Sequence, residues 1–148
     1  MELDRDFSAF IASGIDHDVR FLIVGGYALA AHGHPRFTKD LDVWVLVDPD
    51  NARRLIQALD TFGFGSLGLD PGDFAEDAPV VQLGYPPKRI DILTSATGVD
   101  FHACWQRRVE LTIDGIVVPF ISADDPVANK KAAGRPQDLA DVAALEDN

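Results

Sequence analysis

The sequence contains one cysteine, Cys104, no long apolar run and few basic residues. A single cysteine excludes a disulfide bond within the chain and is typical of a protein from the reducing cytoplasm. No apolar run approaches the roughly 18 residues of a membrane-spanning helix. The acidic start, MELDRDFSAF, lacks the basic and then apolar pattern of a signal peptide. We therefore expect a cytoplasmic protein without a membrane segment.

The shortage of basic residues gives the chain a strong negative charge. Lys and Arg number 13 against 24 Asp and Glu, and the formal net charge at pH 7 is −11. Non-specific binding of a polyanion requires several Lys or Arg contacts to phosphates, so extended nucleic-acid binding is not expected. Short basic clusters, such as the one at 130–135, still allow a local pocket for an anion.

The length and the apolar pattern predict one domain over residues 1–148, with no internal repeat or dividing linker. The core is expected over about residues 19–121, and residues 64–79 read as an irregular loop. Helices are predicted at 3–13 (ending at Gly14), 27–32 and 48–62 (ending at Gly63). Strands are predicted at 19–24, 40–47, 80–83, 89–94, 110–113 and 116–121, the last two joined by an Asp114-Gly115 turn. Short C-terminal helices are expected over 122–148, with Ser122 as the first N-cap. The order predicts an α/β (α+β) fold, a small β-sheet with helices mainly on one face.

Aspartates interrupt two of the predicted strands. Asp40 and Asp42 share one face because side chains at i and i+2 of a strand point the same way, and Asp91 interrupts the apolar run of RIDILT. Like charges this close repel each other unless a cation lies between them, and carboxylates are ligands that Mg²⁺ accepts. Taken alone, Asp40 and Asp42 are better explained as solvated charges at the start of a strand, because so short a motif is common. Three carboxylates on adjacent strands are the arrangement that a two-metal site requires.

A glycine pair, Gly25-Gly26, lies between a predicted strand and a predicted helix. Its backbone amides could face an anion, although a tight turn explains the pair as well. The pair matches neither the dinucleotide-binding fingerprint nor a P-loop, because no G-K-[ST] follows.

The order of an apolar strand, Gly25-Gly26, a short helix, Asp40-Leu41-Asp42 and a later strand with Asp91 resembles the DNA polymerase beta-like nucleotidyltransferase superfamily. The resemblance covers about residues 19–94 and implies the palm fold of that superfamily. The stretches VGGYALAAHGHPRFTKDLDVWV and NKKAAGRPQDLADVAAL are similar to small bacterial nucleotidyltransferases related to AbiEii-type toxins and antibiotic nucleotidyltransferases.

The resemblance implies a metal-dependent transfer of a nucleoside monophosphate from an NTP to a hydroxyl group, with pyrophosphate leaving. Asp40 and Asp42 would hold two Mg²⁺ ions, or Mn²⁺ in their place. Asp91 would bind one of these ions and help to deprotonate the attacking hydroxyl. Gly25-Gly26 would meet the triphosphate.

Five further residues are candidates around the substrate. Arg36 and Lys39 adjoin the aspartate pair and would reach the β- or γ-phosphate, or are solvated charges of a loop. The resemblance assigns a triphosphate contact to Lys130 and places Arg135 and Asp138 on the substrate side. Complementarity between side-chain charges and helix ends explains the sign of these C-terminal charges equally well.

The acceptor stays open between a tRNA end, a protein side chain and a small hydroxylated compound such as an antibiotic. The acidic charge favours a protein or a cationic small molecule. An antitoxin or a second subunit is a candidate partner. The alternative function is a non-catalytic binding or regulatory module on the same fold, such as one partner of a toxin–antitoxin pair. Burying three carboxylates without a metal is costly, which disfavours that alternative.

Overall fold

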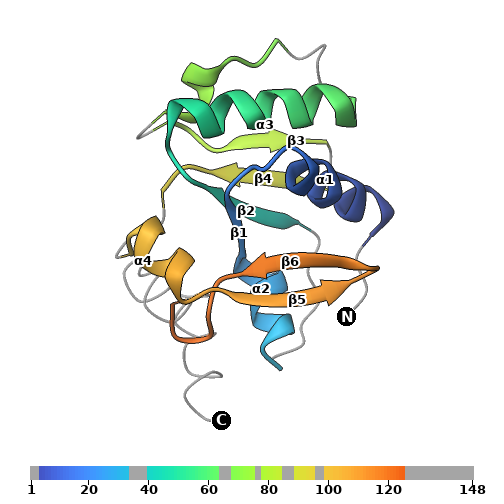
Figure 1. Ribbon diagram of the computed structural model, residues 1–148, viewed down its shortest axis with the longest axis vertical. Coiled ribbons are helices and arrows are strands. Elements are labelled where there is room, and N and C mark those ends of the chain that lie inside the picture. The colour runs from blue at the N-terminus through green and yellow to red at the C-terminus, as the bar shows by residue number, and fades with distance from the viewer. Residues whose placement is uncertain are drawn as a thin grey trace.

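A computed structural model describes residues 4–33, 40–63, 68–75, 78–84, 89–95 and 99–125. Figure 1 shows the elements in chain order, in which η2 is a 3₁₀-helix: α1 (Arg5–Asp16), β1 (Phe21–Val24), α2 (Gly25–Ala31), β2 (Leu41–Val45), α3 (Pro49–Phe62), η2 (Pro71–Phe74), β3 (Val81–Leu83), β4 (Ile90–Leu93), α4 (Phe101–Gln106), β5 (Val109–Ile113) and β6 (Ile116–Phe120). The predicted mixed α/β fold is confirmed, and so are the six predicted strands in their order along the chain.

The strands form one six-stranded sheet in the order β3-β4-β2-β1-β6-β5. β2 and β4 are parallel, as are β1 and β6, whereas β1–β2, β3–β4 and β5–β6 are antiparallel. The β5–β6 hairpin turns at Asp114 and Gly115, whose φ angles of 53° and 79° suit the two-residue turn that the sequence predicts. The sheet is therefore mixed, and β1 and β2 lie at its centre.

The two long helices cover one face of the sheet. Gly14 of α1 lies against the ring of Phe21, and the Ser13 hydroxyl of α1 donates a 2.8 Å hydrogen bond to the Ala58 carbonyl of α3. Helix α4 packs on the other face, where the ring of Phe101 lies 5.1 Å from that of Trp44. In Figure 1, α1 and α4 accordingly lie on opposite sides of β1.

The start of α3 is joined to the strands by a buried asparagine. The carboxylate of Asp48 caps the helix by accepting a hydrogen bond from the backbone N–H of Asn51. The Asn51 side chain is fully buried and bonds three backbone groups, accepting from Arg20 N and donating to the carbonyls of Arg20 and Leu46. This side chain therefore fixes the backbone at the entry to β1.

Three details differ from the sequence prediction. Helix α1 continues through Gly14 to Asp16, since the glycine serves a close approach to Phe21 rather than a helix end: an added Cβ would lie 3.3 Å from that ring. Helix α2 begins at Gly25 itself, and α4 was not predicted. Ser122 accepts a 3.4 Å hydrogen bond from Asp125 N, as expected of an N-cap, and the rest of the predicted C-terminal segment lies outside the described residues.

Within the described ranges, no helix is long and apolar enough to cross a membrane.

Candidate active site

Two of the predicted carboxylates face each other across neighbouring strands. Asp42 of β2 is paired in register with Asp91 of β4, and the two strands are parallel. Residues paired in this way project to the same face of the sheet, about 4.8 Å apart. Asp91 is 8% exposed and Asp42 is half-buried. The distant aspartate of the sequence analysis is thus brought directly beside Asp42.

The guanidinium of Arg89 joins the third carboxylate to this pair. Its Nε and Nη2 donate hydrogen bonds of 2.8 and 3.1 Å to the two oxygens of Asp91, and Nη2 also donates a 2.9 Å bond to Oδ2 of Asp40. The bond to Asp91 is the largest of the causes that raise the pKa of Arg89. Sequence reasoning did not assign Arg89 to the site. The signal was its position two residues before Asp91, which places both on one face if the strand is extended.

The glycine pair lies against the same carboxylates. Val24, the last residue of β1, is paired with Asp42, and Gly25 follows with a φ of +69°. A Cβ on Gly25 would overlap Oδ2 of Asp42 and lie 3.1 Å from Cγ and 3.2 Å from Cβ of that residue. Gly26 follows in the first turn of α2. Gly25 is therefore required both by its backbone angle and by the space that Asp42 fills.

The donor chemistry of this site suits a hard divalent cation, because carboxylate oxygens are ligands that Mg²⁺ prefers. Among the described residues, however, no three His, Cys, Asp or Glu side chains are gathered as they would be around a metal ion. The guanidinium of Arg89 lies between Asp40 and Asp91 and bonds both of them. The carboxylates fit a metal by chemistry, but Asp40 and Asp91 would each have to exchange a hydrogen bond from the guanidinium for it.

The other five predicted site residues, Arg36, Lys39, Lys130, Arg135 and Asp138, lie outside the described residues.

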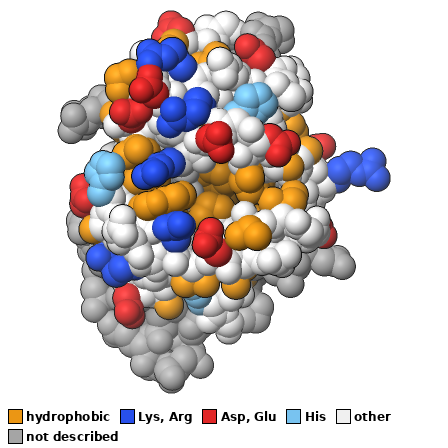
Figure 2. Space-filling model, in the orientation of Figure 1, with side chains coloured by type: hydrophobic (Ala, Val, Ile, Leu, Met, Phe, Trp, Pro, Cys, Tyr) orange, Lys and Arg blue, Asp and Glu red, His pale blue; other side chains and the backbone are white. Residues whose placement is uncertain are grey.

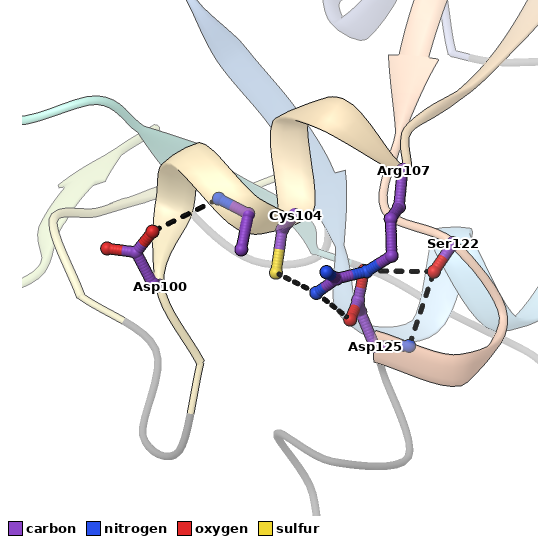
Figure 3. Close-up of polar contacts among 6 residues, drawn as sticks. Asp100, Cys104, Arg107, Ser122 and Asp125 are labelled. Carbon is purple, nitrogen blue, oxygen red and sulfur yellow. Dashed lines mark hydrogen bonds and ion pairs between the residues drawn. The ribbon is translucent and has the colours of Figure 1, made fainter.

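A second polar cluster links α4 to the end of the described chain (Figure 3). Arg107 donates hydrogen bonds of 3.1 and 2.7 Å to the two carboxylate oxygens of Asp125, and the Ser122 hydroxyl donates a 2.9 Å bond to Asp125. Burial is the main cause that raises the pKa of the nearby Cys104 thiol to about 11. Because the thiolate is the reactive form, Cys104 is unreactive at neutral pH. The cluster is structural.

Replacing Asp125 with asparagine is expected to lower the free energy of unfolding by about 1–3 kcal/mol at pH 7, the cost of leaving charged hydrogen bonds unmade. Burial alone would raise the pKa of Asp125, but the bonds from Arg107 and Ser122 outweigh it and leave that pKa below the usual 3.8. A carboxyl group whose folded pKa is lowered stabilises above its unfolded pKa, and this stability is lost as the pH falls through the folded value.

Urea unfolding of wild type and Asp125→Asn between about pH 7 and pH 3 tests this expectation. The difference between the two proteins should shrink below about pH 4. A difference that stays constant across that range would contradict an ionic role for Asp125.

Proteins of known structure share this fold. A proposed nucleotidyltransferase from Thermotoga maritima, solved by crystallography, matches 99% of this chain and 94% of its own, with a TM-score of 0.59 at 12% identity. At that identity, the similarity shows a shared fold. An antigenic nucleotidyltransferase-like protein from Paracoccidioides brasiliensis matches 95% of this chain and 74% of its own at 16% identity, and its TM-score of 0.49 adds nothing to that conclusion.

The model of a sequence family described as "Nucleotidyltransferase of unknown function (DUF6036)" matches residues 1–146. The chain belongs to this family. Among curated proteins, none matches the sequence significantly.

Proposed function

We propose that the protein is a metal-dependent nucleotidyltransferase that transfers a nucleoside monophosphate from an NTP to a hydroxyl group. The observation that carries the proposal is the registered pair of Asp42 and Asp91, with Asp40 within reach of the same guanidinium. Asp42 and Asp91 project from one face of the sheet, and Asp40 directly precedes β2. Carboxylates this close repel one another, and such a cluster is of use where cations enter it. Membership of a nucleotidyltransferase family supports the same reaction.

In this proposal Asp40, Asp42 and Asp91 hold two Mg²⁺ ions, or Mn²⁺ in their place. Bound there, the metal would stabilise charge on the attacking and leaving oxygens and make the acceptor hydroxyl more acidic. Asp91 takes the hydroxyl proton as the hydroxyl oxygen forms its bond to the α-phosphorus. The bond from that phosphorus to the bridging oxygen breaks, and pyrophosphate leaves with its electron pair.

The remaining candidates are proposed to bind the triphosphate. Gly25 and Gly26 bring backbone close to Asp42, so a nucleotide at the carboxylates would lie beside their amides. Arg36, Lys39 and Lys130 are proposed to contact phosphate oxygens, with Arg135 and Asp138 on the substrate side.

The acceptor is proposed as a protein side chain or a small hydroxylated compound. The formal net charge of −11 opposes the approach of a tRNA, which requires a basic surface. A toxin–antitoxin or resistance setting, with an antitoxin or second subunit as partner, is part of the same proposal.

One observation favours a non-catalytic binding module as the second candidate. Arg89 already supplies a cation to Asp40 and Asp91, so these carboxylates are stabilised without any metal. The two candidates differ in whether Mg²⁺ and a nucleotide bind.

Thermal unfolding with Mg²⁺ and each of the four NTPs distinguishes the candidates. A ligand present at about 100 times its Kd stabilises the folded state by about 2.7 kcal/mol. For a chain of this size that is a Tm increase of about 5–10 °C. The increase should require metal and nucleotide together and be lost in Asp42→Asn.

Asp60→Asn provides a matched control, because Asp60 is an exposed aspartate of α3 and is not part of the proposed site. It should keep the full Tm increase. If no NTP raises the Tm of the wild type, the nucleotidyltransferase proposal is contradicted and the non-catalytic binding module remains. Transfer of an α-phosphate label from the preferred NTP to a hydroxylated acceptor would then complete the assignment.

A further inference from the structure

A hollow of about 540 Å³ lies at the start of β1, separate from the carboxylates. Of the described residues in β1 and β6, only Ile23 and Phe120 are paired in register, so the earlier parts of the two strands leave space between them. α1, α3, α4 and β5 complete the wall. The lining residues are Ile15, Asp18, Val19, Arg20, Phe21, Arg54, Trp105, Glu110, Val117 and Pro119. Figure 2 shows apolar side chains gathered in a depression near the centre of this face, with charged side chains around them.

The buried Asn51 contacts both arginines of the hollow, Arg20 through its backbone and Arg54 through its guanidinium. Its side chain bonds the backbone of Arg20 at both N and O, and its Oδ1 lies 3.4 Å from Nη2 of Arg54. Arg54 also donates a 3.1 Å hydrogen bond from Nε to the carbonyl of Asp18. Among the described residues, neither Arg20 nor Arg54 is paired with a carboxylate. No described carboxylate therefore neutralises either charge, and the hydrogen bonds of Arg54 fix the position of its guanidinium.

Most of the other lining residues are apolar, and one of them, Trp105, carries an indole. Val117 is 51% exposed, which is high for a large apolar side chain, whereas Val19 and Phe21 are buried. The ring of Trp105 lies 5.3 Å from the guanidinium carbon of Arg20 and 4.1 Å from that of Arg108. The hollow thus combines apolar surface with a cationic rim, and its volume is within the ~300–1,000 Å³ of small-molecule sites.

The acidic residues of the hollow limit the charge of a ligand. Asp18 is exposed beside Arg54, and Glu110 lies 3.9 Å from Arg108. Because Glu110 is paired with Arg108, the guanidiniums of Arg20 and Arg54 face one remaining carboxylate, that of Asp18. The balance of one positive charge favours a singly charged anion over the double charge of a phosphate monoester. Guanidinium groups bind carboxylates through paired N–H donors.

We propose that this hollow is a binding site for a small organic monocarboxylate, with the carboxylate on Arg20 and Arg54 and an apolar body against Phe21 and Val117. Arg20 and Val24 are four residues apart along an extended segment, so the ligand lies about 13 Å from the Asp42 end of β1. The site is therefore distinct from the one proposed for metal and nucleotide.

Titration of the full chain with 4-phenylbutyrate, monitored by two-dimensional NMR, tests the proposal. The indole N–H signal of Trp105 should shift with a Kd on the order of 1 mM, while that of Trp44, which is 2% exposed, should stay in place. The neutral 4-phenylbutyramide should bind at least about tenfold more weakly, because it lacks the charge that the guanidiniums recognise. Phenyl phosphate should also bind more weakly than the carboxylate.

Substitution of the two arginines tests whether their guanidinium groups bind the carboxylate of the ligand. Arg20→Met and Arg54→Met should each weaken 4-phenylbutyrate binding by about tenfold or more, whereas Arg53→Met, a change at the adjacent exposed arginine, should leave it unchanged. Arg20 is exposed, so its variant remains informative if Arg54→Met fails to fold. Equal binding of the acid and the amide, unchanged binding in both variants, or no shift at about 20 mM would overturn the proposal. Tighter binding of phenyl phosphate would overturn the assignment to a monocarboxylate.

Discussion

Gly25→Ala is expected to abolish Mg²⁺-dependent nucleotide binding and to lower the free energy of unfolding by about 2–5 kcal/mol. Of this, about 1–2 kcal/mol comes from holding alanine at a positive φ, and about 1–3 kcal/mol from overpacking. The new methyl group would overlap Oδ2 of Asp42 and approach its Cβ to 3.2 Å, so rotation of the carboxylate alone does not relieve the contact. Asp42 must move, and with it the registered pair with Asp91.

The variant Gly115→Ala separates the cost of backbone strain from the effect of displacing Asp42. Gly115 has a similar φ, +79°, but nothing lies within 4 Å of the position of an added Cβ. This control should lose the strain energy alone and keep the Tm increase with Mg²⁺ and NTP. Urea unfolding gives the stability of both variants, and thermal unfolding with ligand gives their binding. A Gly25→Ala protein that still binds nucleotide as the wild type does would show that Asp42 need not occupy its present position.

Arg89→Met is expected to destabilise the metal-free protein and to make Mg²⁺ bind more tightly, with an apparent Kd lower by about tenfold. In the wild type the guanidinium bonds Asp40 and both oxygens of Asp91. Its removal leaves the carboxylates facing one another, and a cation entering from solution no longer competes with an internal one. The measurements are isothermal titration with Mg²⁺ alone and the Tm with and without Mg²⁺.

Arg53→Met is the control for the general effect of replacing an arginine with methionine. Its pair with Asp50 is largely exposed, and such pairs contribute little to stability. It should change neither the Tm nor the Mg²⁺ titration. If Mg²⁺ binds the wild type and Arg89→Met equally well, Arg89 does not compete with the metal. If neither protein binds Mg²⁺ and nucleotide, the proposal of a metal site is wrong.

Elements that carry local signals were predictable from the sequence. Helix α3 has a capping carboxylate at Asp48, apolar residues at the helical period and Gly63 in the left-handed region as its C-cap. The β5–β6 hairpin has its turn in Asp114-Gly115. These features act within a few residues, so the physics that forms them is visible in the sequence.

Elements that depend on contacts between distant residues were not predictable from the sequence. Helix α4 has six residues, too few for a repeating helical pattern of apolar residues to be recognised. Its Phe101 packs against Trp44 of β2. Gly14 reads as a helix end until the ring of Phe21 is placed beside it. For the candidate site, aspartates that interrupt two apolar strands already indicated that Asp42 and Asp91 belong together, and the resemblance assigned them to metal ions. The bridge from Arg89 to Asp40 depends on the pairing of β2 with β4, which no short stretch specifies.

The registered pairing of Asp42 with Asp91 also tells an engineer where this chain can be lengthened. Their separation is set by two adjacent parallel strands, not by the path that includes α3, η2 and β3 between them. Each doubling of a connecting loop costs only about 0.6 kcal/mol in closure entropy. A slip of one residue in the register, by contrast, would turn one carboxylate to the opposite face. The connections between the elements that separate the two aspartates, rather than α3 or β3, are therefore places for inserted sequence, provided that β2 and β4 keep their alignment.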